Sequence, residues 1–200
     1  MKEHELHNYK LVLQYEGIRY NGWQKQKNQE NTIQEVVENA VFDGTGERVE
    51  VIGSGRTDAG THAMGQVANV KLGQDLEPER LMDNINKHLP SDIKILECEK
   101  VDNRFHARLN AKAKTYMYTL CVGKKPDVFN RRTVLHYCAD LDVNAMKKAA
   151  EYLKGEHDFM SFCSNKRTKK STVRKIYDIE IIKDGDEISF IFKGNGFLYN

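Results

Sequence analysis

A chain of 200 residues, 40% hydrophobic and 30% charged, is long and apolar enough for one large domain or two small ones with a buried core. The net charge of +2 does not by itself indicate a nucleic-acid partner, and four widely spaced cysteines without a C-x-x-C pair argue against a zinc site or a disulfide scaffold. No apolar run could cross a membrane and the polar N-terminus is no secretory signal, so we expect a cytoplasmic protein with reduced cysteines and no membrane partner.

The first half of the chain alternates strand and helix patterns. Residues 9–15 place every second apolar side chain on one face, as in a half-buried strand. Thr32 and Glu35 form a capping box, which predicts a helix that runs to about Phe42 and stops before Gly44. The further expected elements are strands over 47–52, 66–72 and 93–101, and a helix from Pro78 to a stop at Pro90. This order predicts an α+β unit of the split βαβ, or ferredoxin-like, type.

A glycine-rich loop lies between the strands expected over 47–52 and 66–72. Residues 53–63 read Gly-Ser-Gly-Arg-Thr-Asp-Ala-Gly-Thr-His-Ala, so that Arg56 and Asp58 stand between glycines. Glycine-dense segments occur where the backbone turns sharply or comes close to a ligand. Arg56 and Asp58 in such a segment therefore indicate a site, although an isolated loop of this kind is more often a surface turn with a solvated ion pair.

The second half begins the same order again. A strand is expected over 115–122, then a polar loop, and then a helix from Val143 to Lys154 that Asp142 caps and Gly155 stops. A hairpin is expected from strands over 173–182 and 188–193. This half has strands and one helix but no second helix or closing strand, so we expect an incomplete copy of the first. We place the two halves at residues 1–103 and 104–200.

Basic residues gather in three stretches, of which the second and third contain or adjoin aromatic side chains. The stretches are 166–175, 104–114 next to Tyr116 and Tyr118, and 19–27 around Tyr20 and Trp23. Cations mixed with aromatics suit a polyanion whose bases can stack. Solvated faces and protected strand edges explain the same charges equally well. Tyr20 and Trp23 are expected to pack within the protein rather than to stack on bases.

Nine segments together resemble the tRNA pseudouridine synthase A family in order and spacing. Residues 55–63 are similar to the active-site motif of that family. The other eight segments are 15–24, 32–34, 65–67, 89–93, 105–108, 116–118, 155–159 and 194–199. The resemblance therefore covers nearly the whole chain.

The resemblance implies two α/β halves with joined, mostly antiparallel sheets and a cleft between them, in a homodimer. It implies isomerisation of uridine to pseudouridine at nucleotides 38, 39 and 40 of the tRNA anticodon arm, without cofactor or metal. Asp58 matches the catalytic carboxylate of the family and Tyr116 its substrate-contacting tyrosine. A carboxylate can attack either the sugar or the pyrimidine, and the sequence leaves both routes open.

Other side chains have expected roles around Asp58. Arg56 is expected to hold the carboxylate ionised and to contact phosphate. The ring of Tyr116 can stack on uracil, and its hydroxyl can move a proton at C5. Arg108 and the run 166–175 are candidates for contacts with the tRNA backbone. Three histidines are expected to be packed or hydrogen-bonded, or to contact RNA, rather than to act as acid–base catalysts: His62, His106 and His157.

The resemblance breaks at the end of the sequence. Family members continue beyond the segment matching 197–200 into a helix that opens Met-Val-Arg and a final strand. We therefore expect a truncated synthase that keeps Asp58 and has weak or no activity compared with a version extended through these elements. One alternative is a non-catalytic tRNA-binding fragment or tRNA folding chaperone, in which Asp58→Asn would change nothing. Another is a small-molecule phosphate binder using residues 53–60, although a phosphate cradle normally opens a helix.

Overall fold

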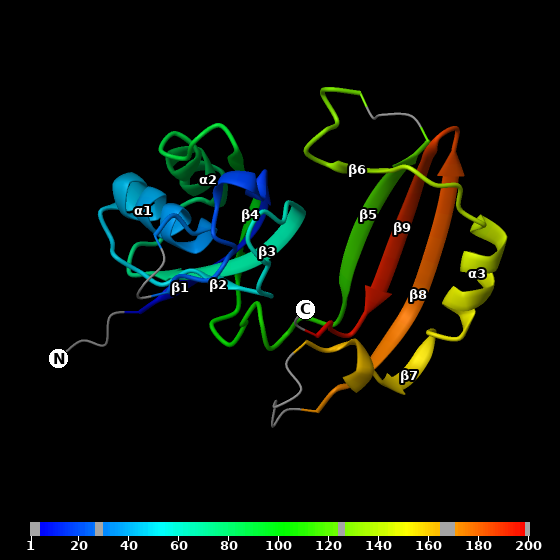
Figure 1. The fold of residues 1–200 in the computed structure, drawn as a ribbon. Coiled ribbons are helices and arrows are strands. Elements are labelled where there is room, and N and C mark those ends of the chain that lie inside the picture. The colour runs from blue at the N-terminus through cyan, green and yellow to red at the C-terminus, as the bar shows by residue number, and fades with distance from the viewer. Residues whose placement is uncertain (1–4, 27–29, 124–126, 165–170, 199–200) are drawn as a thin grey trace. The chain divides into compact units, whose positions relative to one another are not determined.

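The computed structural model describes residues 5–26, 30–123, 127–164 and 171–198. The chain divides into two compact units, residues 1–111 and 112–200 (Figure 1). This division falls after the boundary placed between residues 103 and 104. Residues that follow this boundary are tied to the first unit, since the Asn8 side chain donates to Phe105 O at 2.9 Å and Ala107 N donates to the Asn69 side chain at 2.9 Å. No helix in the described ranges is long and apolar enough to span a membrane.

The first unit contains a four-stranded sheet in the order β2-β3-β1-β4. The strands are β1 (His7–Tyr15), β2 (Ile52–Gly53), β3 (Ala63–Leu72) and β4 (Ile93–Val101). Strands β3 and β4 both pair antiparallel with β1, so they run parallel to each other on either side of it. Helix α2 (Pro78–Asn86) connects them, which is the predicted split βαβ arrangement.

The core of the first unit lies on one face of this sheet. The alternating β1 residues Tyr9, Leu11, Leu13 and Tyr15 are each no more than 4% exposed, as the period of two predicts. Helix α1 (Ile33–Thr45) packs against α2, and α2 packs against β4. Burial of each large apolar side chain contributes about 1.5–3 kcal/mol, so this core provides a rigid base for the loops at the sheet edge.

Helix α1 begins where the capping box predicts. The Thr32 hydroxyl accepts a hydrogen bond from Glu35 N at 3.4 Å. Thr32→Ala is therefore expected to lower the free energy of unfolding by about 1 kcal/mol in a urea titration, because one helix N–H loses its partner. Thr32→Ser keeps the oxygen and should lose less. Equal losses in the two variants would show that the cap is not responsible.

The predicted end of α1 is wrong. The helix continues through Gly44 to Thr45 and is capped by Gly46, which adopts φ +78°. A Cβ on Gly44 would lie 3.1 Å from the backbone of Asn84 in α2. Gly44 therefore serves close contact between two helices, whereas Gly46 supplies the left-handed residue that terminates the helix.

Other boundaries in the first unit also differ from the prediction, since β1 begins at His7 and β3 at Ala63 rather than at residues 9 and 66. Of the strand expected over 47–52, only Ile52 pairs with a neighbouring strand, as part of β2. The backbone N–H of Val51 donates to the Glu38 carboxylate at 3.2 Å instead of to a strand. Helix α2 ends at Asn86 rather than near Pro90. The Asn86 side chain there exchanges two hydrogen bonds with the backbone of Ile95, at 3.0 and 2.8 Å, and joins the helix end to β4.

The second unit contains a five-stranded sheet in the order β6-β5-β9-β8-β7. The strands are β5 (Lys114–Val122), β6 (Val134–Tyr137), β7 (Gly155–Asp158), β8 (Val173–Asp184) and β9 (Glu187–Gly194). Helix α3 (Val143–Glu151) lies along β8 (Figure 1). The predicted β8–β9 hairpin is confirmed, whereas β6 and β7 were not expected. Both strands have only four residues, which is too short for an apolar pattern to identify them. Strand β6 also pairs parallel with β5, so no tight turn in the sequence marks the pairing.

Candidate active site

The glycine loop, residues 53–62, leads from β2 into β3. Its base is fixed to β3, because Ser54 N donates to Val67 O at 2.7 Å and the Gln66 side chain donates to Gly55 O at 2.6 Å. A strand, not a helix, follows the loop. The loop therefore lacks the helix N-terminus that phosphate cradles use, which argues against a small-molecule phosphate site.

Asp58 lies at the exposed tip of the glycine loop. Thr61 N donates to Asp58 O at 3.1 Å, which closes a turn in which Gly60 adopts φ +78°. Arg56 is exposed as well, and no ion pair joins Arg56 to Asp58 within the described ranges. Both charged side chains thus face solvent, where a ligand can meet them.

A second segment, the aromatic loop of residues 16–24, packs against the glycine loop. Trp23 N donates to Thr57 O at 3.0 Å, and Gly60 N donates to Tyr20 O at 3.2 Å. These two hydrogen bonds hold the backbone on both sides of Asp58. The peptide group that precedes Asp58 and the one between Ala59 and Gly60 are therefore held in place although the Asp58 side chain is exposed.

Two glycines allow this close packing. A Cβ on Gly17 would lie 1.9 Å from Thr61 O, and one on Gly22 would lie 2.4 Å from Thr57 O. Gly22 also adopts φ +78°, which L-residues rarely do. The sequence shows glycines at both positions, but it does not predict that they contact the glycine loop.

The aromatic loop is itself anchored to the start of β4. The Tyr20 hydroxyl donates to one oxygen of Asp92 at 2.7 Å, and Arg19 Nε donates to the other at 2.9 Å. Burial and the Asp92 carboxylate raise the pKa of Tyr20, so its hydroxyl stays protonated and donates. Tyr20 is 4% exposed and Trp23 is fully buried, which confirms that they pack inside the protein.

The three histidines that are not expected to act as acid–base catalysts all form hydrogen bonds with backbone atoms. His62 Nδ1 accepts from Gly17 N at 3.3 Å, His106 Nδ1 accepts from Leu109 N at 3.4 Å, and His157 Nε2 donates to Lys154 O at 2.8 Å. Among the residues with described positions, no three His, Cys, Asp or Glu side chains gather as a metal site would require.

The remaining site candidates lie in different parts of the chain. Arg108 belongs to the first unit, and its guanidinium donates to the Gln24 side chain at 3.5 Å, beside the end of the aromatic loop. Tyr116 belongs to β5 in the second unit, is 37% exposed, and meets the Phe197 ring edge-on at 4.9 Å between centroids. In the basic run 166–175, residues 166–170 lie outside the described residues.

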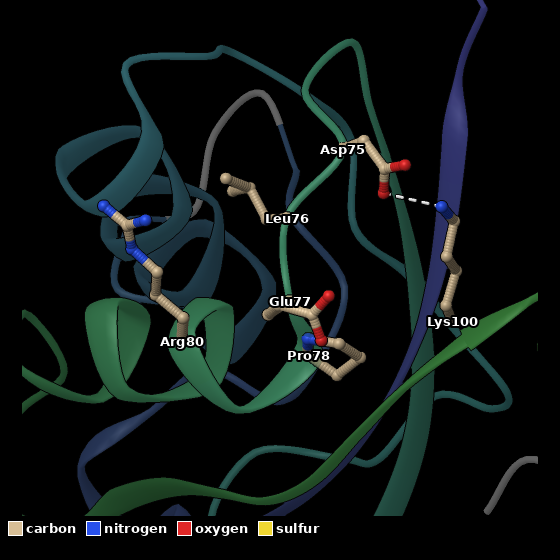
Figure 2. Close-up of a pocket in the computed structure, with 6 residues that line it drawn as sticks. All are labelled: Asp75, Leu76, Glu77, Pro78, Arg80 and Lys100. Carbon is tan, nitrogen blue, oxygen red and sulfur yellow. Dashed lines mark hydrogen bonds and ion pairs between the residues drawn. The ribbon is translucent and has the colours of Figure 1, made fainter.

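A pocket opens at the N-terminus of α2 (Figure 2), but it contains none of the predicted site residues. Its lining residues are Asp75, Leu76, Glu77, Pro78, Arg80 and Lys100. The Lys100 ammonium is paired with Asp75 at 2.6 Å, and the lining carries charges of both signs. This arrangement gives no preference for an anionic or a cationic ligand.

A family model described as tRNA pseudouridine synthase matches residues 11–110 and 149–200. The chain belongs to that family. It is similar over 195 residues to "tRNA pseudouridine synthase A 2" of Bacillus cereus (strain ATCC 10987 / NRS 248), with 43% identity across 98% of this chain and 80% of the relative. It is 44% identical to "tRNA pseudouridine synthase A" of Bacillus sp. (strain KSM-64) and 41% identical to that of Acetivibrio thermocellus, with the same shares covered.

Membership of the tRNA pseudouridine synthase family confirms the resemblance seen in the motifs and the class of enzyme, an isomerase that acts on tRNA. The matched residues 11–110 contain the glycine loop, the aromatic loop and Arg108. Tyr116 falls between the two matched ranges. The family match therefore includes every site candidate of the first unit.

Proposed function

We propose that this chain converts uridine to pseudouridine at nucleotides 38, 39 and 40 of the tRNA anticodon arm, with the Asp58 carboxylate as nucleophile. The observation that carries the proposal is an exposed carboxylate on a loop whose backbone is held on both sides of it, in a tRNA pseudouridine synthase. A fixed backbone beneath a solvent-facing carboxylate suits attack on a substrate that arrives from outside.

The chemistry requires no net oxidation. The N-glycosidic bond between N1 and C1′ breaks, the base turns, and its C5 bonds to C1′. C5 then loses its hydrogen as a proton and N1 gains one, so the atoms of the product are those of the substrate. A carboxylate assists by bonding covalently either to the sugar or to the pyrimidine ring. A paired base must first leave the stem, which exposes it to the tip of the glycine loop.

Three other side chains have proposed roles. Arg56 is exposed two residues from Asp58, where its guanidinium can bind a phosphate of the substrate. Arg108, beside the aromatic loop, contacts the tRNA backbone. Tyr116 keeps one part of its ring exposed while Phe197 packs on it, and this exposed part stacks on the uracil.

The assembly and location follow from the same proposal. A tRNA substrate places the reaction in the cytoplasm, and the resemblance to the family favours a homodimer that works without a cofactor.

The test of specificity uses unmodified tRNA transcripts that carry uridine at nucleotides 38, 39 and 40. Pseudouridine is mapped after incubation with the chain in molar excess, which reveals slow turnover. Replacing one of these uridines with cytidine should remove pseudouridine at that nucleotide alone and create none elsewhere. Equal modification of uridines outside the anticodon arm would contradict the proposal. Binding should weaken steeply as salt rises, because phosphate contacts release counterions.

A further inference from the structure

A buried hydroxyl contacts the residue that precedes Asp58. Tyr15 Oη and Thr57 Oγ1 lie 3.0 Å apart. Tyr15 is the last residue of β1, is 4% exposed, and pairs with Ala63 just after a register shift in the β1–β3 ladder. Its ring centroid lies 6.2 Å from that of Trp23, whose backbone N–H holds the carbonyl of the same Thr57. The Tyr15 side chain therefore links the core of the sheet to the residue that precedes Asp58.

We propose that Tyr15 is a positioning residue for the isomerisation, acting through Thr57 on the direction of the Asp58 carboxylate. The inference rests on the proposed role of Asp58 as nucleophile. Tyr15 makes no contact with the uridine in this account. Its hydroxyl restrains Thr57, the residue bonded through its carbonyl to Asp58.

The physical need for such a restraint comes from the loop itself. A segment with glycines at 53, 55 and 60 has many accessible backbone conformations, and Asp58 has no ion pair to orient it within the described ranges. Rates of covalent attack fall steeply when the reacting atoms are misplaced by about 1 Å. The backbone hydrogen bonds to Thr57 and Gly60 limit the peptide groups, and the Tyr15 hydroxyl additionally limits the Thr57 side chain.

The same strand offers a matched control. Tyr9 lies on the same core face of β1 and is fully buried. Its hydroxyl donates to Leu76 O at 2.9 Å and accepts from Leu76 N at 2.7 Å. Tyr9 and Tyr15 are six positions apart along the strand, which is about 20 Å. Tyr9→Phe and Tyr15→Phe thus remove the same buried hydroxyl at two ends of one strand, and only Tyr15 adjoins the glycine loop.

The experiment compares these two variants of the whole chain by three measurements: amide hydrogen exchange, tRNA affinity, and the single-turnover rate of pseudouridine formation. Tyr15→Phe should accelerate exchange at the Trp23 and Gly60 amides, lower the rate about three- to tenfold, and leave tRNA affinity unchanged. Tyr9→Phe should lower stability without changing exchange at these two amides or the rate. Exchange that is the same in both variants would overturn the proposal, and so would an unchanged rate in Tyr15→Phe.

A double-mutant cycle with Thr57 separates positioning from a purely structural effect. Thr57→Val should slow the reaction as much as Tyr15→Phe, and the double variant should be no slower than either one, because both remove the same hydrogen bond. Thr57→Ser keeps the hydroxyl and should restore most of the rate. Additive losses would overturn the proposal. Failure of the proposed function is distinguishable, since it would appear as full activity in Asp58→Asn, whereas failure of this inference leaves the dependence on Asp58 intact.

Discussion

Asp58→Asn is expected to lower the rate of pseudouridine formation on the order of 10⁴-fold, which is typical of removing a covalent nucleophile. The amide has nearly the same size as the carboxylate but cannot form the covalent bond. Because Asp58 is exposed at the tip of the glycine loop, the substitution disturbs no packing, and the melting temperature should not change. The affinity for tRNA and its salt dependence should also persist, since phosphate contacts provide most of the binding.

Asp43 provides the matched control for this substitution. It is an exposed aspartate on α1, so Asp43→Asn makes the same change in charge on the same unit. The Asp43→Asn chain should keep its rate and its tRNA affinity. A similar loss of rate in both variants would indicate a general effect of charge. Full activity in Asp58→Asn would remove Asp58 from the chemistry.

Gly53→Ala is expected to lower the free energy of unfolding of the first unit by about 3 kcal/mol or more, the upper range for overpacking a core. A Cβ at this position would lie 2.4 Å from Trp23 Cε2 and 2.6 Å from its Nε1. The Trp23 ring is fully buried, and its indole N–H has no hydrogen-bond partner among the residues that the structure describes, so packing holds the ring there. It cannot move aside without shifting the aromatic loop.

Gly65→Ala is the control for Gly53→Ala. The nearest atom to a Cβ on Gly65 is Val12 Cγ1 at 3.8 Å, an ordinary contact. The free energy of unfolding of the Gly65→Ala variant should stay within about 1 kcal/mol of that of the unsubstituted chain. The sequence contains one tryptophan, so the fluorescence of Trp23 during urea unfolding reports on the first unit directly. Equal midpoints for the two alanine variants would show that the Gly53–Trp23 contact is not tight in solution.

The parts of the fold that the sequence predicts are those with a local cause. Alternation of apolar residues predicts β1, and the capping residues Thr32 and Asp142 predict the starts of α1 and α3, as the structure has them. Strands β6 and β7 depend on pairing with distant partners, and β7 reads Gly-Glu-His-Asp, which has no apolar side chain. The prediction that α1 stops before Gly44 is wrong because this glycine is needed for the close contact with helix α2, which the local sequence does not reveal.

The candidate site shows the same division. Asp58 and Arg56 were found from a short motif, because their residue types and the surrounding glycines stand together in the sequence. The contacts beneath them were not found. Thr57 meets Tyr15 and Trp23, which precede it by more than thirty positions, and only packing brings these segments together. Glycines at 17 and 22 were the available signal, since a side chain at 22 would strike Thr57 O and one at 17 would strike Thr61 O in the same glycine loop.

The most direct test of the account is pseudouridine mapping at nucleotide resolution in unmodified tRNA after incubation with a molar excess of the chain or of its Asp58→Asn variant. The unsubstituted chain should form pseudouridine at nucleotides 38, 39 and 40, and the variant should form none, although it binds the same tRNA. Pseudouridine at the same nucleotides and at the same rate with the variant would contradict it.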